Sequence, residues 1–437
     1  AQASWQETSF DLLRNGREDE ARQLLLQVVD RDPVNEEAHA MLGQIAFDQK
    51  QYKKAATHFA KSPTVLKENP LLLVNYAECL LETKAHIEAL RSLEELPEQD
   101  DVAQFESGVL LARFDDHKSA ERHFQLAKDY PNPYPVAYNL GLTQYHLGKF
   151  KQCVATLEAI RTRFKTNDIL NLLGLAYIEL GELNKAVEIL EEGMRNNPLD
   201  ERNYVAVAKL ATESQRVNLG LRILGRGLRY LPQSYPLLMQ HGYLNLLQSR
   251  YADAEREYRK ALNLQPNSSD TRLGLAFVLM ADQRHSEAEV MVREVIDLDS
   301  SNALAHYLIG ELLIIGGVQP GTAAEKEAVN HLEQTVSLQP HFAVAHLSLG
   351  KLYLKRKELA PAIRELEMAI QYDPSEKAAH YQLAVAYRQN GEKEKSLEAL
   401  TKVQQMNVEE RNLGRNRLLY KKLRTVGEGV PDPGVDR

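Results

Sequence analysis

The fold is decided by the stretch from residue 167 to residue 200, NDILNLLGLAYIELGELNKAVEILEEGMRNNPLD. Apolar side chains recur at helical spacing in both halves, at Leu170, Leu173 and Tyr177 and again at Val187, Leu190 and Met194. Gly181 lies between the halves, where glycine ends a helix in a left-handed conformation at little cost. Asn197 precedes Pro198, and the residue before a proline is biased away from helical angles. The stretch therefore predicts two helices joined by a tight turn.

The same pattern returns every 34 residues. Small residues keep this step at Gly174, Ala208, Gly242, Ala276 and Gly310. A second small residue follows twelve positions after each of the first four, at Ala186, Gly220, Ala254 and Ala288. Two small residues per unit indicate two helices that cross closely. Because one such hairpin cannot bury its apolar face alone, the units are expected to stack.

The pattern resembles the tetratricopeptide repeat family. The family consensus follows Leu170, Leu173, Gly174, Tyr177, Ala186, Leu190, Gly193 and Pro198, and again Leu238, His241, Gly242, Asn245, Ala254, Tyr258, Ala261 and Pro266. The resemblance implies an all-α fold, a right-handed superhelical solenoid of about twelve helix-turn-helix tetratricopeptide repeats with a C-terminal capping helix. The second small position marks twelve repeats over residues 3–407, at Ala21, Ala55, Ala89, Ala120, Cys153, Ala186, Gly220, Ala254, Ala288, Ala328, Ala362 and Ser396.

Three segments depart from the regular array. The step from Ala288 to Ala328 is 40 residues, so repeat ten holds an insertion, which we place at residues 316–326. A tolerated surface loop is the favoured interpretation, and a partner contact is the alternative. Residues 408–424 predict a capping helix, with a basic docking site as the alternative, and residues 425–437 predict a flexible tail.

Composition excludes several classes of protein. The 437 residues hold 53 basic and 61 acidic side chains, and this net charge of −8 argues against nucleic-acid binding. No apolar run reaches the roughly 18 residues of a membrane span. The chain starts at Ala1. If Ala1 follows a cleaved signal peptide the protein is extracytoplasmic, and otherwise we expect it in the cytoplasm.

No catalytic, cofactor or metal motif is recognised. The sequence lacks GxGxxG, GxxxxGK[ST], HExxH, a CxxC pair and GxSxG, so we predict no enzyme activity and no cofactor. Cys79 and Cys153 stand two repeats apart and are predicted to be buried thiols. Four histidines recur once per repeat, at His39, His306, His346 and His380. Equivalent atoms of stacked helices lie about 10 Å apart, so these histidines are predicted to fill the core rather than bind metal.

The resemblance also implies where a partner binds. In this family the first helix of each repeat forms the concave wall, and its second, fifth, ninth, twelfth and thirteenth places face the groove. These places give a predicted partner-binding groove of Tyr138, Leu142, Tyr145, Met239, Tyr243, Leu246, Leu273, Phe277, Met280, Tyr307 and Ile314, beside Leu247 and Ile315. Repeats two and eleven offer polar residues there, so the wall is predicted to be apolar in its middle. The alternative is that these side chains bury one another.

Family members that clamp a terminal carboxylate use asparagine, lysine and arginine from successive first helices. Asn75 and Asn139 occupy the asparagine place without the cationic residues, so a receptor of that kind is not expected. We predict a non-catalytic protein-interaction scaffold that binds an apolar peptide or helix of a protein partner. The alternatives are an assembly component of an envelope or secretion machine, and the regulatory arm of a larger enzyme such as a glycosyltransferase.

Overall fold

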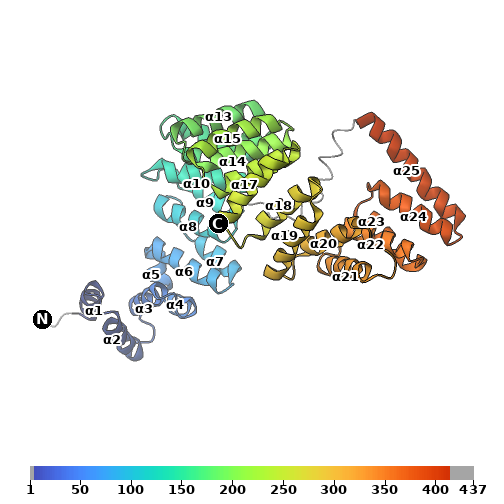
Figure 1. The fold of residues 1–437 in the computed structure, drawn as a ribbon. Helices are drawn as coiled ribbons and strands as arrows, with labels where there is room; N and C mark the ends of the chain where they lie inside the picture. Colours follow the sequence, from blue (N-terminus) through green and yellow to red (C-terminus); the bar gives the residue numbers. More distant parts are fainter. Residues whose placement is uncertain (1–3, 414–437) are drawn as a thin grey trace. The chain divides into compact units, whose positions relative to one another are not determined.

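A computed structural model describes residues 4–413, and every regular element in that range is an α-helix. The chain divides into two compact units between Ala206 and Val207. Figure 1 shows successive helices packed side by side within each unit. The first unit contains α1 (Trp5–Arg14), α2 (Glu18–Arg31), α3 (Glu36–Asp48), α4 (Tyr52–Phe59), α5 (Pro63–Glu68), α6 (Pro70–Glu82), α7 (His86–Leu93), α8 (Asp101–Arg113), α9 (His117–Leu126), α10 (Pro133–His146), α11 (Phe150–Arg161), α12 (Asn167–Glu179) and α13 (Leu183–Asn196).

The boundary between the units falls inside α14 (Glu201–Glu213). The second unit then contains α15 (Val217–Tyr230), α16 (Tyr235–Leu247), α17 (Tyr251–Leu264), α18 (Ser269–Ala281), α19 (His285–Leu298), α20 (Ala303–Ile315), α21 (Ala323–Leu338), α22 (Ala343–Lys355), α23 (Leu359–Tyr372), α24 (Lys377–Gln389) and α25 (Lys393–Leu413). With α5 set aside, the helices of residues 4–413 form twelve consecutive hairpins, as the repeat spacing predicts.

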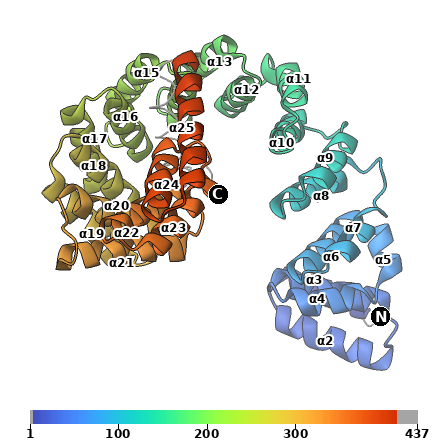
Figure 2. The ribbon, with the colours of Figure 1, turned by 90° about the vertical axis from the view of Figure 1, so that its right-hand side faces the viewer.

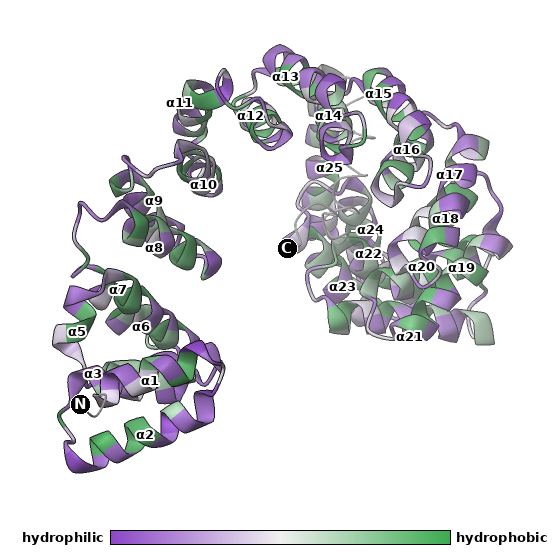
Figure 3. Ribbon diagram, turned by 90° about the vertical axis from the view of Figure 1, so that its left-hand side faces the viewer, coloured by the Kyte–Doolittle hydropathy of each residue, from purple (hydrophilic) through white to green (hydrophobic). Residues whose placement is uncertain are grey.

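The hairpins of each unit present their first helices on one side and their second helices on the other. In the first unit α8, α10 and α12 share a side, and α9, α11 and α13 lie opposite (Figure 3). In the second unit α16, α18 and α20 share a side, and α15, α17 and α19 lie opposite (Figure 2). Each unit therefore has a wall made of first helices, which is where the predicted binding residues stand.

Every hairpin turn of the described residues contains a residue with a positive φ, and the turn of repeat ten contains two, Gly317 and Gly321. Gly181 has a φ of 74°, which confirms the predicted helix stop. Only five of the twelve turns use glycine, and the others place a polar residue with a φ of 57° to 64° in the same position, at Lys50, Lys84, Asp115, Gln215, Ser249, Gln283 and Lys357. The turn geometry is thus a property of the repeat, and stacking supports it even where the residue itself disfavours it.

Close packing within a hairpin depends on the small residue of the first helix. A Cβ atom added to Gly174 would lie 2.4 Å from Cδ2 of Leu190, so only glycine admits this leucine. Leu190 and its equivalents Leu224, Val292 and Leu366 are fully buried, whereas Leu400 in the last described hairpin is exposed, at 36%. The core therefore consists of layers that each need a neighbouring repeat.

Two segments differ from the regular hairpin. The second helix of repeat two is interrupted, because Pro63 cannot continue a helix, and a separate short helix α5 follows α4. In repeat ten the turn spans residues 316–322, which lie within the predicted range 316–326, and residues 323–326 belong to α21. Of the predicted cap, residues 408–413 continue α25 without a break. Residues 414–424 and the tail 425–437 lie outside the described residues.

Candidate functional site

The predicted wall of the second unit consists of the first helices α16, α18 and α20. Most of the predicted residues on it are half-buried, namely Met239, Tyr243, Leu246, Leu247, Phe277, Met280, Tyr307 and Ile314. Ile315, at the end of α20, is 49% exposed. Leu273 is only 5% exposed and belongs to the core shared by α16 to α20, so the prediction that it lines the wall is wrong.

The wall is continuous with the core beneath it. Met239, Leu246, Phe277, Met280 and Tyr307 all pack against one hydrophobic cluster of buried side chains from α17 to α20. The Met239 sulfur accepts a hydrogen bond from the Thr271 hydroxyl at 3.4 Å, between neighbouring repeats. These residues therefore both support the stacking and offer a part of their surface outward.

Tyr307 is the most constrained of these side chains. Its ring lies 5.1 Å from the Phe342 ring, centroid to centroid, and it contacts the clusters on both sides of α20. Burial raises the pKa of its hydroxyl above the ordinary value. Tyr307 therefore joins two layers of the array as well as contributing to the wall.

The other predicted wall residues, Tyr138, Leu142 and Tyr145, lie on α10 in the first unit and are half-buried. Tyr138 stacks on Tyr134 with 6.0 Å between ring centroids, and burial raises its pKa. Tyr145 packs edge-on against Phe150 at 5.4 Å. The structure thus divides the predicted residues into two sets, one in each compact unit.

A groove that the sequence did not predict lies on the wall of repeats one to three. It encloses about 580 Å³ between α1, α3, α5 and α6. Phe10 and Leu71 are 57% and 50% exposed there. We call this surface the N-terminal groove, and its lining is Gln6, Phe10, Glu37, Ala40, Met41, Gln44, Val65, Asn69, Leu71, Leu72 and Asn75. The family places for wall residues include Phe10 and Leu71, but the sequence hypothesis concentrated on repeats five and eight to ten.

Helix α5 completes this groove and is held by one carboxylate. Glu36, at the start of α3, accepts hydrogen bonds from the Thr64 amide at 2.6 Å, the Val65 amide at 3.3 Å and the Thr64 hydroxyl at 3.0 Å. Burial opposes ionisation of Glu36, but these hydrogen bonds outweigh it and lower its pKa. Pro63 and Pro70, each at a first helical position, were the available signals for α5 and α6.

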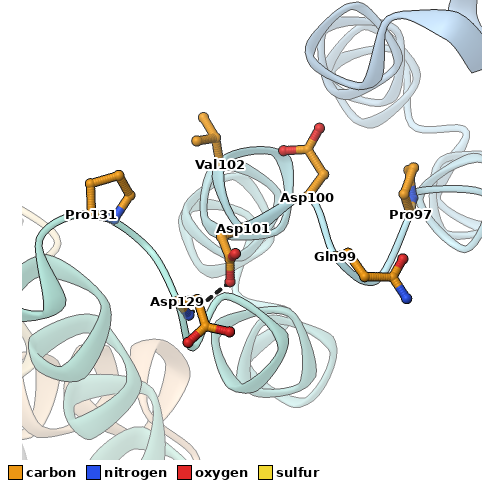
Figure 4. A pocket seen from close by; sticks show the side chains of 7 residues that line it. All are labelled: Pro97, Gln99, Asp100, Asp101, Val102, Asp129 and Pro131. Carbon is orange, nitrogen blue, oxygen red and sulfur yellow. Dashed lines mark hydrogen bonds between the residues drawn. The ribbon is translucent and has the colours of Figure 1, made fainter.

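A second hollow, of about 520 Å³, lies at the start of α8 (Figure 4). Two of its acidic side chains already accept hydrogen bonds from backbone amides. Asp100 caps α8 by accepting from the Ala103 amide at 3.0 Å, and Asp101 accepts from the Asp129 amide at 2.9 Å. We therefore interpret this hollow as the surface of a turn between repeats.

The four recurring histidines are structural, as predicted. Each is at most 8% exposed. Each places Nε2 at 2.9 to 3.1 Å from the carbonyl oxygen six residues earlier, on Pro33, Ser300, Pro340 and Pro374. A carbonyl only accepts, so Nε2 carries the proton and the ring fastens the preceding turn to its helix. The residues that the structure describes hold no cluster of three or more metal-ligating side chains.

The cysteines and the asparagines are also engaged within the protein. Cys79 and Cys153 are free and buried, which confirms the prediction, and burial raises the pKa of each thiol to about 12. Asn75 donates to Gln44 Oε1 at 2.9 Å, and Asn139 donates to the Pro135 carbonyl at 2.8 Å. In the described part of the chain, no helix has the length and hydrophobicity needed to span a membrane.

Comparison with known proteins gives family matches along the chain. Four models described as tetratricopeptide repeat match residues 11–64, 168–198, 245–312 and 356–432. A comparison with curated proteins gives no match. Among solved structures, the Cut9–Hcn1 hetero-tetramer of the APC/C is similar at 15% identity and a TM-score of 0.45, covering 97% of this chain and 95% of that chain.

Two other solved structures are similar in the same way. Yeast Tom70 has 12% identity and a TM-score of 0.45, covering 97% of this chain and 94% of that chain. MamA from Desulfovibrio magneticus RS-1 has 20% identity and a TM-score of 0.35, covering 40% of this chain and 96% of that chain.

Proposed function

Since the chain belongs to the tetratricopeptide repeat family, we propose that it is a non-catalytic scaffold that binds an apolar peptide or helix of a protein partner. The binding surface in this proposal is the wall of α16, α18 and α20. One observation carries it: half-buried apolar side chains from three successive first helices pack against a single core cluster and so form one continuous strip.

The composition of the strip supports this choice. Helix α16 contains no Asp, Glu, Lys or Arg, and α20 contains only Glu311. Met239 and Met280 provide flexible, polarisable contacts of the kind that suit an adaptable binding surface. An amphipathic helix or extended segment could place its apolar side chains along such a strip.

The structure also decides which substitutions test the proposal. Aspartate at Phe277 or Tyr307 would disturb the core that these rings contact. Leu247 and Ile315 lie at the outer ends of α16 and α20, and Ile315 is 49% exposed. The double variant Leu247→Asp with Ile315→Asp should therefore keep the fold and place two charges on the strip.

The experiment is affinity purification of the tagged chain from its native cells, with mass spectrometry of what is retained. We expect the double variant to lose the partner while its far-UV circular dichroism is unchanged. The matched control is Val290→Asp, because Val290 is 53% exposed on α19, a second helix. Retention of the same partner by the double variant, or its equal loss from the Val290 control, would contradict the proposal.

A further inference from the structure

The N-terminal groove differs from the wall of the second unit in its chemistry. Its apolar residues Phe10 and Leu71 are exposed by half or more of their surface, whereas most of the wall residues of α16 to α20 are half-buried. Polar side chains surround them, and Gln44 bridges two of these by accepting from Asn75 and donating to Asp48 at 2.8 Å. A volume of about 580 Å³ is of the size that takes a few anchoring side chains.

The first helices that form this part of the wall are strongly acidic. Helices α1, α3, α6 and α8 together carry nine acidic residues and two basic ones. The first helices of the last two repeats, α22 and α24, carry four basic residues and no acidic one. The negative charge is therefore concentrated on the first helices of repeats one to four and is not a general property of the wall.

Two of these carboxylates have no cationic partner among the residues that the structure describes. Glu78 pairs with Arg113 at 2.5 Å. In contrast, Glu37 on the groove lining and Asp48 beside it accept only side-chain amide hydrogen bonds, from Gln6 at 3.1 Å and from Gln44. Carboxylates in such a position attract cationic groups, and the attraction is strengthened where apolar walls reduce the access of water.

We propose that the N-terminal groove binds a basic segment of a protein partner, with apolar side chains seated against Phe10 and Leu71 and lysine or arginine beside Glu37 and Asp48. The negative charge excludes nucleic acid and anionic membrane surfaces, which would repel this wall. This site lies in the other compact unit from the apolar strip and takes a basic segment rather than an apolar one, so the proposal can hold or fail independently of the function proposed above.

The probe is a fluorescein-labelled synthetic peptide, LKKLLKKLLKKL, added to the full chain and followed by fluorescence anisotropy. We expect saturable binding that weakens as the salt concentration rises, because the charges are exposed. The matched peptide LEELLEELLEEL should not bind. The variant Glu37→Lys with Asp48→Lys should raise Kd by about tenfold or more. Phe10→Ala with Leu71→Ala should also weaken binding, while far-UV circular dichroism stays unchanged in both variants.

The charge control is Asp30→Lys with Glu88→Lys, two exposed acidic residues on the second helices α2 and α7. It changes the net charge equally, so an equal loss of binding would overturn the groove as the site. A further variant, Arg415→Gln with Arg417→Gln and Lys421→Gln, removes charge from the chain's own basic segment without adding acidic groups that would attract the probe. If this variant binds the probe more tightly than the unaltered chain, the chain's own segment occupies the groove and the partner proposal is overturned. Unchanged affinity supports a partner.

Discussion

Gly174 and Gly225 both lie inside helices, yet their surroundings differ. A Cβ atom on Gly174 would meet Leu190 at 2.4 Å, whereas one on Gly225 would meet nothing within 4 Å. Gly174→Ala should therefore destabilise the protein by about 1–3 kcal/mol through overpacking. Gly225→Ala, the matched control, should stabilise it by roughly 0.5–1 kcal/mol because alanine favours helix. Urea denaturation followed by circular dichroism measures both, and equal shifts in the two variants would contradict this account.

His123 gives the protein a predictable response to acid. Its Nδ1 donates to Gln104 Oε1 at 2.7 Å, and Gln104 is fixed in turn by the Pro97 carbonyl. Burial, with a smaller contribution from Arg122, lowers the pKa of His123 to about 4. The unfolded chain, with a histidine pKa of about 6.5, therefore takes up the proton first as pH falls. The stability that the neutral His123 side chain contributes is therefore fully present above about pH 6.5 and is lost as the pH falls towards 4.

The variant His123→Gln removes this proton uptake and keeps a donor for Gln104. The unaltered chain should lose about 2 kcal/mol of stability from this site between about pH 7 and pH 5, and the variant should lose that much less. Urea midpoints at the two pH values test this. His341→Gln, at an exposed histidine, is the control and should retain the pH dependence of the unaltered chain. An undiminished pH dependence in His123→Gln would show that other groups cause it.

At the scale of elements, the enlarged turn between α20 and α21 is anchored rather than free. Val318 is buried against α21 and α22. Glu325 is 1% exposed, accepts from the Gly321 amide at 2.6 Å and pairs with Arg356 at 3.1 Å, at the end of α22. Burial opposes ionisation of Glu325, but Arg356 and the Gly321 amide outweigh it and lower its pKa. One carboxylate thus fastens the turn to the following repeat.

Glu325→Ala should destabilise the second unit by about 2–3 kcal/mol, because it leaves Arg356 without its partner and opens a buried position. Hydrogen exchange of the amides at residues 317–322 should accelerate. The control is Glu327→Ala, two residues away, whose pair with Arg293 is on the surface at 2.7 Å and should be worth less than about 1 kcal/mol. If the two variants exchange alike, the anchor does not act as described.

At the same scale, the repeat period did not predict an interruption of a helix that leaves the length of the repeat unchanged. Helices α4 and α5 together replace one long second helix, and the 34-residue step from Ala55 to Ala89 is unaffected. The periodicity therefore could not reveal α5, although Pro63 could. This mattered for function, because Val65 and Asn69 line the N-terminal groove.

At the scale of the whole molecule, the repeated pattern predicted the helical class, the twelve hairpins and their order. It did so because each hairpin repeats one set of packing requirements, as at Gly174 and Leu190. The exposure of wall residues was harder to predict. Leu273 and Ile315 both hold wall places of the family, yet one is buried and the other half exposed. Their exposure depends on the neighbouring repeats, which the place within one repeat does not specify.

The enlarged turn of repeat ten has a consequence for how such proteins change over evolution. It adds six residues to one hairpin, and Ala328, Ala362 and Ser396 then resume the 34-residue step. The free-energy cost of closing a loop grows slowly with its length, by roughly 0.6 kcal/mol for each doubling of the number of residues. New sequence can therefore be acquired at this edge without altering the repeats that follow. The exposed pair Gln319 and Pro320 marks a place where a short foreign sequence could be inserted.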